Sequence, residues 1–250
     1  MAQPRLPLRD PRTVARDIPG VLDVLFPRLS GGLVTTLNKK MFTFEKIRPI
    51  CDTLVESTQV QRAMIFEIGM ARAEFLLAGD PEPNWQECLD LAAVRQRRHY
   101  DAKIPAGLEQ VDMEIADQAA SNLVAMLLQV QAQHGNKHIE VSPVIPGLGW
   151  IASGTGDFAI GKTLVEVKHT DRNFTAADFR QVLIYWLLKY ADAIETNDHI
   201  WTNLLLLNPR RNSGLSVNFD FLMRSASSNS NRVELSELLR SMVSPDLDRR

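Results

Sequence analysis

Cysteine is scarce in this chain of 250 residues, which contains only Cys51 and Cys88. Both lie in contexts that look helical, and they lack the CxxC spacing of metal-binding or redox pairs. The sequence therefore excludes a disulfide framework and gives no indication of a zinc site. We expect two reduced thiols in a cytoplasmic protein.

The chain also lacks a long hydrophobic run and a surplus of positive charge. Its densest apolar run, Val182 to Leu188, is far shorter than the ~20 residues of a membrane-spanning helix, and Met1 to Gly20 holds no continuous apolar segment. We therefore expect a soluble protein with no membrane association. A net charge of −2 argues against coating of nucleic acid by bulk electrostatics, so any polyanion must be bound locally.

Helical patterns dominate the first part of the chain. We expect helices near Phe42 to Glu56, Gln59 to Leu77 and Trp85 to Arg98, and a long amphipathic helix from Leu108 to about Gln133. No chemical motif stands out before residue 105. This helical region could recognise substrate, form a homo-oligomer or bind a protein partner.

After residue 136 the pattern changes to short β-branched segments separated by glycine and proline. We expect strands within Ile139 to Val144, Gly149 to Ile160, Thr163 to His169, Ile200 to Leu207 and Leu215 to Phe221. Helices are expected from Ala176 to about Ile194, with Thr175 as N-cap and Asp178 completing a capping box, and from Val233 to Met242 after a serine-rich loop at Ser225 to Ser230.

This order predicts an α/β fold, a mixed α+β sheet flanked by helices. We divide the chain into a mainly helical N-terminal region (1–105), a core (106–224) and a serine-rich loop with a C-terminal helix (225–250).

A hairpin in the core places three charged side chains on one face. With Gly161-Lys162 as a two-residue turn, Asp157 falls opposite Glu166, with Cβ atoms about 4.5 to 5.5 Å apart. Lys168 lies on the same face, about 7 Å along the strand. The opposite face is apolar and comprises Phe158, Ile160, Val165 and Val167.

Two carboxylates at this distance repel each other unless a cation lies between them. Asp157 and Glu166 are hard oxygen ligands for Mg²⁺ or Mn²⁺, joined by a backbone carbonyl near Val167. Lys168 would orient a water molecule or stabilise transition-state charge. The alternative is a surface hairpin that carries a solvated ion pair.

Asp157, the tripeptide Glu166-Val167-Lys168, and Gln181 with Tyr185 on the next helix resemble the PD-(D/E)XK nuclease superfamily. The resemblance covers roughly Leu108 to Leu207 and departs from the family's pattern at Gly156, where proline is usual. It implies a restriction-endonuclease-like core with an N-terminal helical extension. Gln181 would support the catalytic site. For the acid that the family's first core helix often supplies, the helical wheel favours Asp112, although this residue could also simply complement the helix dipole.

The resemblance further implies a Mg²⁺- or Mn²⁺-dependent nuclease of prokaryotic type, acting on DNA rather than RNA, in defence against phage and other foreign DNA or in repair. The residues themselves do not distinguish DNA from RNA. Arg172 and Arg180 could hold substrate phosphates. The alternative is a catalytically silent scaffold with this fold, or a nucleic-acid-binding subunit of a larger complex.

Gly156 to Thr163 also matches the pattern G-x-x-x-x-G-K-T of a phosphate-binding P-loop. A P-loop opens directly into a helix, whereas Thr163 is followed by a strand sequence, Leu-Val-Glu-Val-Lys. The context therefore argues against nucleotide hydrolysis.

Overall fold

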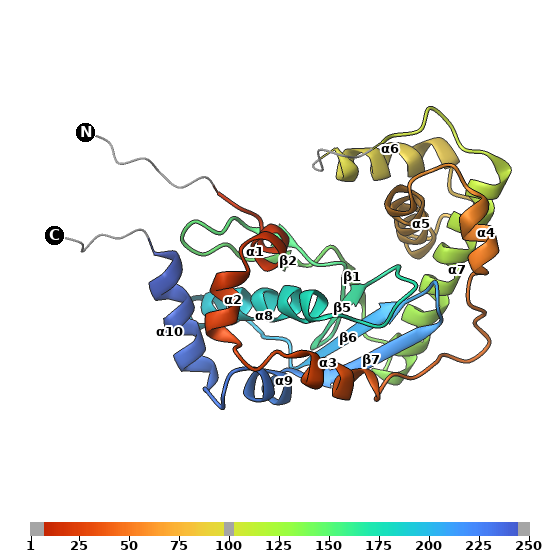
Figure 1. Cartoon of the computed structure of the whole chain (residues 1–250). Coiled ribbons are helices and arrows are strands. Elements are labelled where there is room, and N and C mark those ends of the chain that lie inside the picture. Colours follow the sequence, from red (N-terminus) through yellow and green to blue (C-terminus); the bar gives the residue numbers. More distant parts are fainter. Residues whose placement is uncertain (1–7, 98–102, 245–250) are drawn as a thin grey trace, which may run out of the picture.

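A computed structural model describes residues 8–97 and 103–244 of the chain (Figure 1). Its helices are α1 (Pro11–Asp17), α2 (Pro19–Leu25), α3 (Gly31–Asn38), α4 (Asp52–Ser57), α5 (Arg62–Leu77), α6 (Trp85–Gln96), α7 (Gln110–Gln133), α8 (Ala176–Thr196), α9 (Phe219–Ala226) and α10 (Arg232–Val243). Its strands are β1 (Ile139–Val141), β2 (Val144–Ile145), β3 (Gly154–Thr155), β4 (Phe158–Ile160), β5 (Thr163–Val167), β6 (Asn203–Asn208) and β7 (Ser213–Asn218). Within these two ranges, no helix is both long and apolar enough to cross a membrane.

Five of these strands form one mixed sheet in the order β1-β4-β5-β6-β7. Only the β5–β6 pair is parallel among the pairs of this sheet, because α8 carries the chain back between these two strands. Helices cover both faces, with α7 packed on one and α8 on the other. The expected mixed α/β sheet flanked by helices is therefore confirmed.

The helices gather into two groups around α7 and α8. Figure 1 shows α4, α5 and α6 beside α7 at one end of the molecule, and α1, α2 and α10 around α8 at the other. This second group explains why Val182 to Leu188 is apolar on every side. A helix covered by a sheet and by further helices has no face left for water.

The hairpin of β4 and β5 has the register that the sequence predicts. Phe158 pairs with Val165, and Ile160 pairs with Thr163. Gly161 takes a φ of 56°, a left-handed conformation that suits glycine in a two-residue turn. The apolar face is also as expected: Phe158, Ile160, Val165 and Val167 pack in one cluster with α7.

The helix expected at Phe42 to Glu56 is wrong except for the short α4. Residues 39–51 run instead as an extended strap across the end of β6 and β7. Phe42 exchanges backbone hydrogen bonds with Gly214, and Phe44 receives one from and donates one to the side chain of Asn212. These long-range partners outweigh the local helical pattern.

Smaller departures lie at element ends. The strand expected from Gly149 to Ile160 is broken into β3, which pairs with β2, and β4, which pairs with β1. The strand expected from Leu215 to Phe221 ends at Asn218, and Phe219 begins α9, because the side chain of Asn218 caps the helix by accepting from Phe221 N.

Replacing Gly161 by valine should lower the free energy of unfolding by about 1–2 kcal/mol, because a branched side chain is strained in the left-handed region. Space is not the obstacle, since a Cβ there would lie 3.6 Å from the nearest atom, Lys137 Cγ. Gly161→Asn should cost less, because asparagine tolerates this conformation. Denaturant unfolding of both variants measures the difference; equal stabilities of the two would contradict a strained turn.

Candidate active site

Hydrogen bonds between backbone and carboxylate groups link the segments of Asp157 and Glu166 across the hairpin. Asp157 immediately precedes β4, and the register of the pair places it opposite Glu166 in β5. The backbone N–H of Asp157 donates to Glu166 Oε1 at 3.2 Å, and the N–H of Val167 donates to Asp157 Oδ2 at 2.7 Å. The two carboxylates are therefore held side by side by backbone donors.

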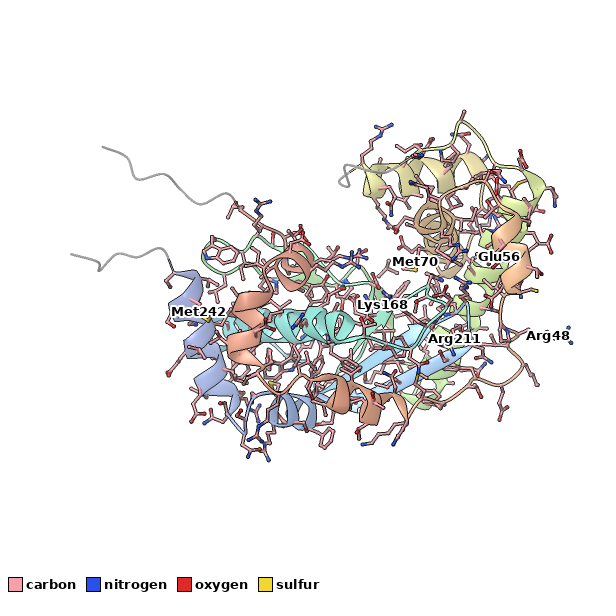
Figure 2. The ribbon with its side chains drawn as sticks, in the orientation of Figure 1. Arg48, Glu56, Met70, Lys168, Arg211 and Met242 are labelled. Atoms are coloured by element: carbon pink, nitrogen blue, oxygen red, sulfur yellow. The ribbon has the colours of Figure 1, made fainter. Side chains whose placement is uncertain are left out.

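Lys168 and Gln181 close a buried polar network around Glu166. Lys168 Nζ lies 3.3 Å from Glu166 Oε2 and 3.0 Å from Gln181 Oε1, and Gln181 Nε2 donates to Glu166 Oε2 at 2.8 Å. Figure 2 shows Lys168 near the middle of the molecule, beyond the end of β5. The exposed fractions are 1% for Glu166, 3% for Gln181 and 9% for Lys168, which excludes a solvated surface ion pair.

Tyr185 extends this network along α8. Its hydroxyl accepts a hydrogen bond from Gln181 Nε2 at 3.0 Å, as the spacing of four residues on one helix allows. Burial, and after it the charges of Glu166 and Asp157, raise the pKa of Tyr185, so that its hydroxyl keeps its proton.

The electrostatics of the site favour an additional cation. Burial, and next the charge of Asp157, raise the pKa of Glu166 to about 8, although Lys168 and Arg12 act in the opposite direction. The raised pKa means that Lys168 and Arg12 compensate only part of the cost of charging this buried acid beside a second one. A divalent ion would supply that compensation.

The donor atoms fit Mg²⁺ or Mn²⁺. Asp157 is only half-buried, so the pair can be reached from solvent. The Val167 N–H donates to Asp157 Oδ2, which places the Val167 backbone beside the first of the two acids. These residues would offer such an ion two carboxylates and, with the backbone carbonyl of Val167, a third oxygen.

Gly156 explains the departure from the usual proline before the first acid. Its N–H donates to the carbonyl of Pro143 at 2.9 Å, a bond that proline cannot make. A Cβ at this position would lie 3.3 Å from Glu166 Oε1. The small residue therefore leaves room for the carboxylate.

Asp112 lies elsewhere in the molecule, at the start of α7. Its carboxylate accepts from Glu109 N at 2.9 Å and from the hydroxyl of Thr58, and it is 3% exposed. The helical wheel places it correctly on the buried face. The structure nevertheless uses it to cap α7 and to fasten the segment after α4, and does not bring it into a metal-binding group with Asp157 and Glu166.

The two arginines expected to hold phosphates flank the start of α8. Arg180 pairs with Asp23 at 2.5 Å, which ties α8 to α2. The side chain of Arg172 is exposed and has no hydrogen bond or ion pair to a residue in the described part of the chain. The side chain of Arg172 is therefore more available than that of Arg180 to bind a ligand.

Two further charged residues lie near the site without belonging to any motif in the sequence, Arg12 of α1 and Glu67 of α5. Asp157 and Glu166 both raise the pKa of Arg12 against the opposing effect of burial, which is the largest influence. Burial raises the pKa of Glu67, Arg95 lowers it, and Asp157 raises it further. Both residues belong to helices outside the motif, so only the folded chain brings them close.

His169 follows Lys168 but faces away from the site. Its ring stacks on Phe66 of α5 with centroids 4.6 Å apart. Burial, and then the charges of Arg210 and Lys168, lower the pKa of His169 to about 3, so the ring is neutral. It joins the end of β5 to α5 and is not positioned as a metal ligand.

In the absence of metal, the stability difference between wild type and Glu166→Gln should depend on pH. Folding raises the pKa of Glu166 from 4.5 to about 8, so the folded state binds more protons than the unfolded state between these values. Wild type should therefore lose stability relative to the variant as pH rises from 5 to 8, by no more than about 1.4 kcal/mol per pH unit. Chemical unfolding in EDTA at several pH values measures this slope, and parallel profiles would contradict a raised pKa.

Comparison of the chain with protein-family models, curated proteins and solved structures finds no match in any of the three. The resemblance to the PD-(D/E)XK superfamily therefore stays a prediction, based on the motif residues. What the structure adds is the geometry around Asp157, Glu166, Lys168 and Gln181.

Proposed function

We propose that this chain is a metal-dependent nuclease that hydrolyses phosphodiester bonds of nucleic acid, with Asp157, Glu166 and Lys168 at its active site. One observation carries the proposal: a half-buried aspartate lies directly beside a buried glutamate, which is itself held by a lysine and a glutamine. Buried charge of this kind costs stability unless it is fully compensated, so its concentration at one place points to function.

The order and pairing of the elements support the same proposal. Helix α7 is followed by β1, β4 and β5, then by α8, then by β6 parallel to β5. The acid pair lies on two neighbouring strands, and Gln181 with Tyr185 lies on the helix that follows. This is the arrangement that the resemblance to PD-(D/E)XK nucleases leads one to expect.

Asp157, Glu166 and the Val167 carbonyl would hold Mg²⁺ or Mn²⁺. When bound, such an ion polarises the phosphate and lowers the pKa of water. Gln181 keeps the Glu166 carboxylate oriented, since its amide donates to Oε2 while its carbonyl accepts from Lys168. Both ends of this amide are used, which fixes the glutamate and the lysine relative to each other.

Lys168 has one donor to spare. Its ammonium group can donate three hydrogen bonds, and among residues 8–97 and 103–244 it has two acceptors, Glu166 Oε2 and Gln181 Oε1. The third can orient a water molecule or a phosphate oxygen. A cation in this position would stabilise the charge that develops on the phosphate in the transition state.

We further propose DNA as the preferred substrate and defence against foreign DNA, or repair, as the role. This part of the proposal rests on the resemblance alone. The buried charges support the chemistry and do not distinguish one nucleic acid from another.

Purified protein should cleave plasmid DNA, linear DNA or single-stranded RNA in the presence of Mg²⁺ or Mn²⁺ and not in EDTA. Asp157→Ala and Lys168→Ala should each lower the cleavage rate at least about 100-fold, because one removes a metal ligand and the other removes transition-state stabilisation. Gel analysis of the products measures the rate and identifies the substrate.

Two exposed residues provide matched controls. Glu140→Ala removes an acid from β1 of the same sheet, and Lys162→Ala removes a lysine from the turn of the same hairpin. Both should cleave as wild type does. If wild type cuts none of the three substrates while Asp157→Ala binds Mn²⁺ and nucleic acid as wild type does, the chain is a silent scaffold or binding subunit.

A further inference from the structure

Helix α1 is fixed beside the segment that leads to Asp157. Arg9 N donates to Trp150 O at 3.2 Å, and Ala152 N donates to Arg9 O at 2.8 Å. A Cβ built on Gly154 would lie 3.0 Å from Pro11 Cδ. The first turn of α1 is therefore packed on the segment that ends at Asp157, while the rest of α1 packs along α8 (Figure 1).

Two arginines project from this helix. Arg12 and Arg16 are four residues apart and share one side of α1, whereas Pro11, Val14 and Ala15 are buried beneath it. Both arginines have solvent-exposed surface, yet enough protein surrounds them for burial to lower the pKa of each. Neither forms a hydrogen bond or an ion pair with a residue in 8–97 or 103–244.

The charges around the two arginines differ. Arg12 is near enough to Asp157 and Glu166 for both acids to raise its pKa. For Arg16, burial lowers the pKa and the positive charge of Arg12 lowers it further, with only partial opposition from Asp178. The two guanidinium charges repel each other, as like charges four residues apart on a helix do, and the carboxylates offset this repulsion at Arg12 but not at Arg16. An anion between the two guanidinium groups would remove that cost.

We propose that Arg12 and Arg16 bind a backbone phosphate of the nucleic-acid strand next to the scissile bond, so that α1 forms part of the substrate-binding surface. This inference rests on the proposed nuclease function. A guanidinium group presents a planar fork of donors that matches two phosphate oxygens. It also explains how a chain with net charge −2 can hold a polyanion: the cations are concentrated beside the active site.

The same geometry allows a purely structural role, in which Arg12 only neutralises the two acids. The roles differ in what the loss of Arg12 does to metal binding and to nucleic-acid binding. A neutralising arginine competes with the metal, so its removal should tighten Mn²⁺ binding and leave nucleic-acid binding unchanged. A phosphate-binding arginine should affect nucleic-acid binding directly.

Fluorescence anisotropy of labelled DNA and RNA oligonucleotides, measured in Ca²⁺ and in EDTA at several salt concentrations, tests the proposal. Arg12→Ala and Arg16→Ala should each weaken binding about tenfold or more and reduce the slope of log K against log salt by about 1. Arg12→Lys should keep the wild-type slope with reduced affinity, because it keeps the charge and loses the fork. Arg224→Ala, which removes an exposed arginine from α9, should bind as wild type does.

Unchanged oligonucleotide binding in Arg12→Ala and Arg16→Ala, with or without tighter Mn²⁺ binding, would overturn the proposal, as would wild type that binds no oligonucleotide. The nuclease function is tested separately, by cleavage. Metal-dependent cleavage with no effect of the arginines on binding would leave the nuclease and remove the α1 surface. Arginine-dependent binding without cleavage would leave the surface and remove the nuclease.

Discussion

The contact between the Glu166 carboxylate and the side chains of Lys168 and Gln181 is the interaction on which the site depends. A carboxylate that is 1% exposed is strongly destabilising unless hydrogen bonds and opposite charge surround it. To hydrogen-bond this carboxylate, β5 and α8 must pack at one relative position, with Gln181 facing the strand. It also requires Asp157 to lie across the hairpin, where its N–H completes the set of donors. The hydrogen bonds to Glu166 therefore determine both how α8 packs on the sheet and how the two carboxylates lie relative to each other.

Three separate parts of the chain meet around this carboxylate. The hairpin supplies the acids and Lys168, α8 supplies Gln181 and Tyr185, and α1 supplies Arg12 beside them. The apolar surroundings strengthen the electrostatic interactions within the group, because little water is present to screen them. They also make the pair of acids costly in the absence of metal, which raises the pKa of Glu166. Under the proposed function, a cation bound here would offset that cost.

Local chemistry made much of this site predictable from sequence. The Gly161-Lys162 turn determines the register of β4 and β5, and a register in turn determines which side chains share a face. The start of α8 is also marked locally, by Thr175 and Asp178, because a capping box joins residues three apart in the sequence. What sequence could not supply were long-range partners. The strap at residues 39–51 is hydrogen-bonded to Gly214 and Asn212, and Asp112 is hydrogen-bonded to Thr58. Arg12 lies near the site only because α1 packs on α8.

A crystal of the protein soaked in Mn²⁺ would test the central claim most directly, because the anomalous scattering of manganese locates the ion without reference to activity. The account predicts a peak bonded to oxygens of Asp157 and Glu166 and to the carbonyl of Val167, and no peak there in Asp157→Ala. A crystal that binds Mn²⁺ only at other positions, or retains the same peak in Asp157→Ala, would contradict it.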